Sequence, residues 1–127
     1  MNEVIILCLW INNRIFAAIF LNDILMNYGY VKVAAAVPRV KVADCKFNAR
    51  EIEKEIIIAE GKGVQIIAFP ELCVTGYTCG DLFAQQLLLE EAEMGLIQIV
   101  SNTRQLDIIA ILGMPIAMNG VLLNAAV

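Results

Sequence analysis

The sequence predicts an α/β fold in which strands and helices follow the order β-α-β-α-β-β. Short runs rich in Val, Ile and Ala alternate with longer segments whose apolar residues recur every three or four positions. This alternation is typical of parallel strands that are joined by helices. Near the end of the chain, Asn119 and Gly120 stand between two apolar runs. Because Asn-Gly favours a two-residue turn between antiparallel strands, part of the sheet is expected to be antiparallel.

The first two expected elements are a strand over residues 31–37 and the helix that follows it. The strand is rich in Ala and Val, which predicts burial on both of its faces. Asn48 and Glu51, three residues apart, predict the start of the helix as a capping box. Gly61 and Gly63 predict its end. One face of the helix carries an apolar stripe made of Ala49, Ile52, Ile56 and Ala59.

The second strand is expected over residues 65–69, a short apolar run that Pro70 closes. Glu71 therefore stands at the carboxyl end of a strand.

The next segment, residues 82–103, has a helical composition. Gly95 weakens its middle by about 1 kcal/mol, so the segment forms one helix or two. Asp81 precedes it and is expected to cap it. A third buried strand is predicted over residues 108–114, and the hairpin turn then leads into a fourth strand.

The composition excludes several classes of function. The chain has 127 residues, of which 60% are hydrophobic and 17% are charged, so it is one core-rich domain or a piece of one. Its formal net charge of −4 lacks the basic character that binding to a phosphate backbone requires, so nucleic acid is not expected as a partner. The absence of His excludes Ser-His-Asp catalysis, Cys-His catalysis and His-based metal sites within the chain.

The cysteines predict free thiols rather than a disulfide framework. Cys8, Cys45, Cys73 and Cys79 include no pair separated by two residues, which is the spacing of zinc ribbons and redox motifs. We therefore expect no metal site. Scattered thiols in a Pro-poor chain fit a reducing compartment, and the expected location is cytoplasmic.

Residues 1–27 form an apolar extension that we expect to lie outside the domain, which comprises residues 28–127. Two apolar runs, 4–11 and 15–21, are separated by Asn-Asn-Arg. A spanning helix needs about 20 apolar residues and would place this Arg near the bilayer centre, so a membrane is not expected as a partner. A secretory signal is disfavoured because an acidic residue precedes the first run. Met26 is the expected natural start, and a helix that lies on a surface or packs on the protein is the alternative.

The segment after the second strand is the first candidate for a functional site, because ligands of open α/β sheets bind outside the carboxyl ends of the strands. A carboxylate at this place, flanked by apolar residues, is suited to act as a general base. From position alone, Glu71 more often proves to be a solvated group or a structural hydrogen-bond acceptor than a catalytic group.

Residues 69–83 contain F-P-E-L, T-G-Y and D-L-F, in that order. Pro-Glu-Leu after a short apolar strand is similar to the nitrilase or carbon-nitrogen hydrolase superfamily. The longer string resembles the glutaminase domain of glutamine-dependent NAD synthetases. V-K-V-A-A-A-V, I-L-G-M-P and L-N-A-A-V look like further strands of that family. The resemblance covers residues 28–127 and implies the N-terminal part of a nitrilase-like α-β-β-α sandwich.

The resemblance implies hydrolysis of the side-chain amide of glutamine by a Cys nucleophile, a Glu general base and a Lys that stabilises the oxyanion. Glu71 matches the Glu. Tyr77 matches a position that contributes to the glutamine pocket, and a Tyr packed in a loop is an equally good interpretation. The positions of the family's Lys and Cys fall after Val127, so this chain alone is expected to be inactive. Neither Cys73 nor Cys79 matches the nucleophile.

The complete enzyme implied by this resemblance passes ammonia to an ATP-dependent synthetase domain. No cofactor is expected in residues 1–127, whereas ATP, Mg and deamido-NAD are expected for that further domain. The implied partners are glutamine as the small-molecule substrate, the C-terminal remainder of the enzyme, and further copies of the enzyme in a homo-oligomer.

Two alternatives stay open. A stand-alone amidase of the same superfamily would be indicated by a reading frame without a synthetase domain. A non-catalytic fragment, membrane-associated or structural, would be detected by fractionation of tagged protein.

Overall fold

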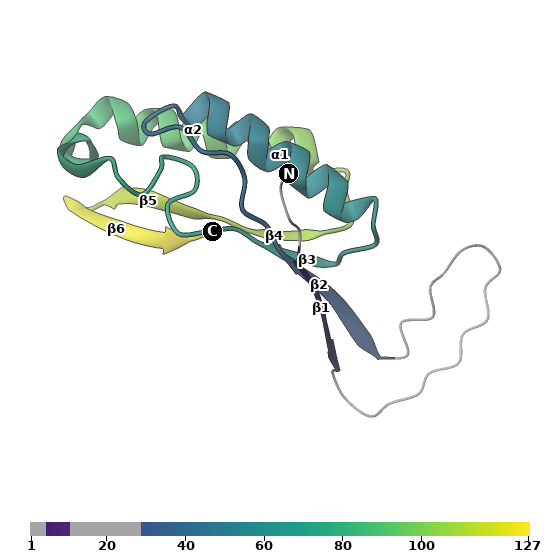
Figure 1. The fold of residues 1–127 in the computed structure, drawn as a ribbon. Coiled ribbons are helices and arrows are strands. Elements are labelled where there is room, and N and C mark those ends of the chain that lie inside the picture. Colours follow the sequence, from purple (N-terminus) through teal and green to yellow (C-terminus); the bar gives the residue numbers. More distant parts are fainter. Residues whose placement is uncertain (1–4, 11–28) are drawn as a thin grey trace.

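The structure is a computed structural model that describes residues 5–10 and 29–127 (Figure 1). Strands β1 and β2 are antiparallel neighbours, whereas β2, β3 and β4 are parallel. Together they form a four-stranded sheet in the order β1-β2-β3-β4, with the bounds Ile5–Trp10, Tyr30–Ala35, Ile66–Ala68 and Ile109–Ile111. A separate antiparallel pair consists of β5 (Gly113–Met118) and β6 (Val121–Ala126).

The helices α1 (Cys45–Glu60) and α2 (Gln86–Thr103) lie on the same side of the strands, as Figure 1 shows. A short 3-10 helix, η1 (Gly80–Ala84), precedes α2. The hydrophobic core fills the space between the helices and the strands, and its largest fully buried side chains include Ile52, Ile56, Ile67, Ile99 and Met114. From β2 onward, the element order is β-α-β-α-β-β-β, which confirms the predicted α/β class and adds one strand.

Helix α1 confirms the predicted apolar stripe but not the predicted start. The helix begins earlier, at Cys45, because the side chain of Asp44 accepts the N–H of Phe47 at 3.0 Å and so caps the first turn. Asn48, which the sequence suggests as the cap, is buried inside the helix, where its amide bonds to the backbone of two loops. Glu51 bonds to basic side chains instead of closing a capping box. The stripe is buried with no exposed surface at Ala49, Ile52, Ile56 and Ala59.

The helical segment that follows is divided, but not at its glycine. Gln85 has extended backbone, with φ −89° and ψ 124°, and separates η1 from α2. Gly95 stays buried inside α2. Asp81 is exposed within η1, and no side chain forms a capping bond at the start of either helix, so the predicted cap is wrong.

The predicted third strand, residues 108–114, is in fact two strands. Leu112 separates β4 from β5, and its N–H and C=O pair with Val127 at 2.8 and 2.9 Å. The chain thus leaves the four-stranded sheet at this residue and enters the hairpin. The predicted turn is confirmed, since Asn119 and Gly120 adopt the positive φ values of 54° and 77° that such a turn needs.

Burial on both faces of the first parallel strand is not found in the part of the chain that the structure describes. Within β2, Ala34 is buried, whereas Val33 is half-buried and Ala35 is exposed. Ile109 of β4 is likewise 62% exposed. The reason is that both helices pack on the same face of the sheet.

The backbone of Ile5–Trp10, inside the predicted extension, pairs with β2 from Ile5 opposite Ala35 to Trp10 opposite Tyr30. Here the backbone is a strand and not the helix offered as the alternative. Residues 1–4 and 11–28, including the suggested start at Met26, lie outside the described residues, and the domain boundary stays a prediction. Among the helices that the structure describes, none has both the length and the apolar character needed to cross a bilayer.

Candidate active site

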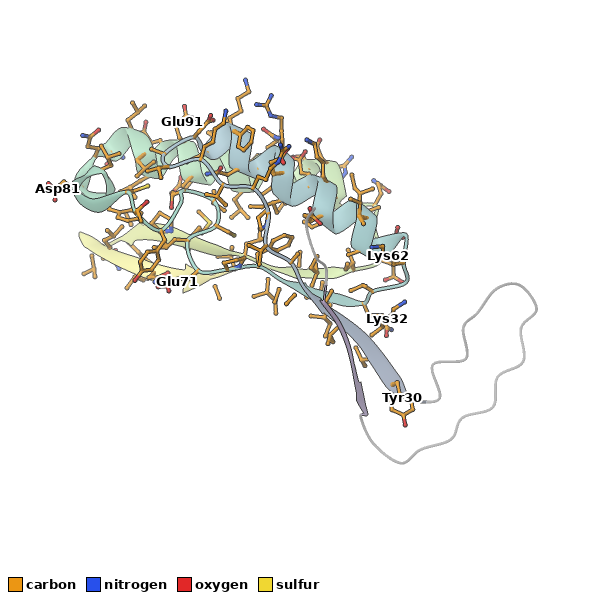
Figure 2. All side chains as sticks on the ribbon, viewed as in Figure 1. Tyr30, Lys32, Lys62, Glu71, Asp81 and Glu91 are labelled. Carbon is orange, nitrogen blue, oxygen red and sulfur yellow. The ribbon has the colours of Figure 1, made fainter. Side chains whose placement is uncertain are left out.

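Glu71 lies just after β3, at the carboxyl end of a strand that has parallel neighbours on both sides. Its side chain is exposed, and its Oε1 accepts an N–H from the Nδ2 of Asn124 in β6. Figure 2 shows Glu71 beside the β5–β6 hairpin. The predicted placement of Glu71 at a strand end is therefore confirmed, and it is the place where α/β sheets bind ligands.

The loop after Glu71 holds the backbone of this residue in one conformation. Leu72 has a positive φ of 51°, which an L residue adopts only where its surroundings fix it. The C=O of Leu72 accepts the N–H groups of Thr75 and Gly76 at 3.2 and 2.8 Å. It also accepts the hydroxyl of Thr75 at 3.4 Å. A short, closed turn therefore follows Glu71, whose side chain is exposed.

Gly113, the first residue of β5, supports this loop from the other side. A Cβ at this position would lie 2.5 Å from the N of Leu72 and 2.8 Å from the Cα of Glu71. The C=O of Gly113 accepts the N–H of Val74 at 3.4 Å and the thiol of Cys73 at 3.5 Å. Only a residue without a side chain allows the strand to approach the loop so closely.

An open pocket of about 240 Å³ lies against Glu71. Most of its lining is apolar, and Glu71 supplies the only titratable side chain among the lining residues. A polar substrate group could therefore meet one carboxylate and one amide within an apolar wall, which is the usual composition of a small-molecule site. The lining residues are Phe69, Glu71, Ile111, Leu112, Gly113, Asn124, Ala125 and Ala126.

The structure does not bring Tyr77 into this pocket. Its side chain is 67% exposed and is not part of the lining. The substrate-binding role of Tyr77 stays a prediction.

Asn124 is the functional candidate that sequence reasoning missed. The Asn-Gly turn fixes its register, because Met118 opposite Val121 places Pro115 opposite Asn124. Register alone does not say what the side chain meets, since the Glu71 loop is 53 residues away in the sequence.

The cysteines near the site have the character of structural thiols. Cys45, Cys73 and Cys79 are buried and free, as the sequence predicts, whereas Cys8 lies outside the residues whose side chains are described. Burial raises the pKa of the Cys73 thiol, and it raises the pKa of Cys45 to about 11 with a contribution from the nearby Glu91. The thiol of Cys79 donates to the C=O of Thr75 at 3.2 Å. Because the reactive form is the thiolate, the raised pKa values make Cys45 and Cys73 poor nucleophiles. Cys79 is buried, with its thiol bonded to the backbone.

The charged groups around the site are few. In the part of the chain that the structure describes, no Lys or Arg forms an ion pair with Glu71. Nor do three or more Cys, Asp or Glu side chains cluster there as metal ligands. The described residues thus provide one carboxylate and one amide donor.

Two relatives to which the chain is similar are glutamine-dependent NAD(+) synthetases. The chain is 31% identical over 101 residues to the glutamine-dependent NAD(+) synthetase of Mycobacterium leprae, a match that covers 80% of this chain and 15% of that protein. It is 39% identical over 74 residues to the glutamine-dependent NAD(+) synthetase of Aquifex aeolicus, covering 58% of this chain and 13% of that protein. The chain therefore spans about one seventh of the length of these relatives.

Solved structures agree with this similarity. A crystal structure of a glutamine-dependent NAD(+) synthetase from Cytophaga hutchinsonii matches with a TM-score of 0.70 and 30% identity. The match covers 76% of this chain and 16% of that one, and it confirms the predicted nitrilase-like fold. The carbon-nitrogen hydrolase family matches residues 32–127, a range that includes the strand end, the Glu71 loop and the hairpin. Because this family model matches most of the chain, the chain belongs to the carbon-nitrogen hydrolase family.

Proposed function

We propose that this chain is part of a glutaminase domain, which hydrolyses the side-chain amide of glutamine and supplies ammonia for NAD synthesis. The relatives named above, glutamine-dependent NAD synthetases, support the choice of glutamine over other amides. Free, buried thiols support a reducing compartment, the cytoplasm, as its location.

In the proposed reaction, Glu71 is the general base. Its carboxylate takes the proton of a Cys thiol while the sulfur attacks the amide carbon of glutamine. A Lys stabilises the resulting oxyanion. When the carbon–nitrogen bond breaks, the proton passes from Glu71 to the departing ammonia. A water molecule then hydrolyses the thioester to release glutamate and the free thiol.

The Cys and the Lys of this proposal belong to the protein beyond Val127, together with the synthetase domain that binds ATP, Mg and deamido-NAD. Within the described residues, Glu71 has no ion-pair partner, and the Cys73 thiol is buried and donates to the C=O of Gly113. Residues 1–127 by themselves are therefore expected not to release glutamate from glutamine.

One observation carries the proposal. Glu71 stands exposed at the carboxyl end of β3, where it lines an open and mostly apolar pocket, and a closed turn and Gly113 support its backbone. A group that must exchange a proton with a substrate needs this combination of access and fixed position.

The test is Glu71→Gln in the complete protein, assayed for NAD synthesis with glutamine and, separately, with ammonium salt. Gln keeps the size of the side chain but cannot take a proton, so glutamine-dependent synthesis should fall about 10²- to 10⁴-fold. Synthesis from ammonium should continue, because it bypasses amide hydrolysis. Glu93→Gln, the same change at an exposed position of α2, is the matched control and should leave both activities unchanged.

Two results would contradict the proposal. Equal loss with both nitrogen sources would mean that Glu71 supports the fold rather than the reaction. Undiminished use of glutamine would remove Glu71 from the mechanism.

A further inference from the structure

We propose that Asn124 is the positioning residue of the site, which holds the carboxylate of Glu71 by one oxygen and leaves the other oxygen to accept the proton. This inference rests on the proposed function and adds to it a residue from a different element. The Nδ2 of Asn124 donates to Oε1 of Glu71, and both side chains line the same pocket.

The chemistry of the pair allows one arrangement. An ionised carboxylate only accepts hydrogen bonds, whereas the amide of Asn offers two N–H donors on its nitrogen. The nitrogen of Asn124 must therefore face Glu71, because its oxygen would repel the carboxylate. The bond orients Oε1 without adding a charge to a pocket whose lining contains no other titratable side chain.

The β5–β6 hairpin carries both Asn124 and Gly113, the residue that contacts the Glu71 loop. Gly113 in β5 touches the Glu71 loop, and Gly113 pairs with Ala126 of β6. Asn124 stands two residues before Ala126 in the same strand, opposite Pro115. One hairpin thus contacts both the backbone next to Glu71, through Gly113, and its carboxylate, through Asn124. A displacement of about 1 Å at a reacting group can cost about 10²-fold in rate, so this double support matters for catalysis.

Two substitutions in the complete protein test this role. Asn124→Leu removes the donor at similar size, and it should lower kcat for glutamine about 10- to 10²-fold while KM changes less than about threefold. Asn124→Asp replaces the donor by an acceptor, and at neutral pH it should lower kcat at least as much because two carboxylates then repel each other. Synthesis from ammonium should be unchanged in both variants.

The pH dependence of Asn124→Asp separates positioning from a merely structural contact. As the pH falls, the introduced carboxyl takes up a proton and becomes a donor again. The ratio of the variant's kcat to that of the wild type should therefore rise toward lower pH. For Asn124→Leu this ratio should not rise, because Leu cannot become a donor. The matched control is Asn102→Asp, because Asn102 also donates to a glutamate, Glu53, at 3.2 Å between α1 and α2. It should leave kcat unchanged at every pH.

The outcomes are distinct from those of the Glu71 test. If Glu71→Gln abolishes the use of glutamine but both Asn124 variants keep the wild-type kcat, the positioning role is wrong and the proposed function stands. Loss of ammonium-dependent synthesis in both Asn124 variants would assign Asn124 to folding and would overturn the inference as well. If Glu71→Gln has no effect, the proposed function itself fails.

Discussion

Gly113→Ala should both destabilise the protein and impair the candidate site. The added Cβ would lie 2.5 Å from the N of Leu72, 2.8 Å from the Cα of Glu71 and 2.8 Å from the O of Pro70. Ordinary contacts of such an atom begin at 3.4 Å, and all three neighbours are backbone atoms that cannot rotate away. Strand β5 and the Glu71 loop must therefore separate by roughly 0.5–1 Å, a form of overpacking that costs about 1–3 kcal/mol.

Urea unfolding and glutamine hydrolysis measure the two effects. With a denaturant slope of about 1–3 kcal/mol/M, the loss of stability should lower the urea midpoint by about 1 M. The same shift moves Glu71 relative to the hairpin, so kcat for glutamine should fall by up to about 10²-fold.

The matched control is Gly95→Ala in the middle of α2. A Cβ there would meet Val74 at 3.4 Å and Ala49 at 3.7 Å, which are ordinary contacts. Because Ala favours a helix over Gly by about 1 kcal/mol, this variant should have an equal or higher urea midpoint. If Gly113→Ala matched the stability and activity of Gly95→Ala, the close approach of β5 to the loop would have no importance for the site.

Three further predictions concern the scaffold and the N-terminal segment. Glu51 bonds to Lys54 and Arg39, and these bonds hold the pKa of its carboxyl below the ordinary value. The stability that these bonds contribute is present above the ordinary pKa of a Glu and is lost as the pH falls through the lowered pKa. Glu51→Gln should therefore reduce the urea midpoint at pH 7 but not in acid. An equal reduction at the two pH values would refute this prediction. Asn48→Ala leaves three backbone groups without the partner that its amide provides, so the free energy of unfolding should fall by at least about 1–3 kcal/mol, and an unchanged urea midpoint would contradict this. The complete protein translated from Met26 should use glutamine as fast as the longer form, and loss of that activity at normal expression would show that the N-terminal segment belongs to the domain.

The sequence correctly predicted the structural features that depend on short-range patterns. The apolar stripe of α1, the end of β3 before Glu71 and the Asn119-Gly120 turn each depend on residues within a few positions of one another. The period of a helix, the stop at a Pro and the positive φ of a two-residue turn are local properties, so local sequence predicts them.

Two of the errors have one cause, which is competition from distant residues. Asn48 has the right type and spacing for a helix N-cap, but its side-chain amide donates to the C=O of Val74. Asp44 caps the helix instead. Residues 108–114 have the composition of one strand, but Leu112 pairs with Val127 and divides them. Propensity is worth a few tenths of a kcal/mol per residue, and a buried hydrogen bond or a strand pairing outweighs it.

The candidate site shows the same division. The sequence by itself determined the α/β class and the position of Glu71 at a strand end, because both follow from the order of apolar runs and their terminators. Only the tertiary structure decided that Asn124 donates to Glu71, that Gly113 lies close to the backbone of the Glu71 loop, and that Tyr77 lies outside the pocket. The contacts of Gly113 and Asn124 with the Glu71 loop join residues about 40 to 50 positions apart in the chain. No local pattern encodes which of these residues meet. The parallel sheet and the hairpin bring them together when the protein folds.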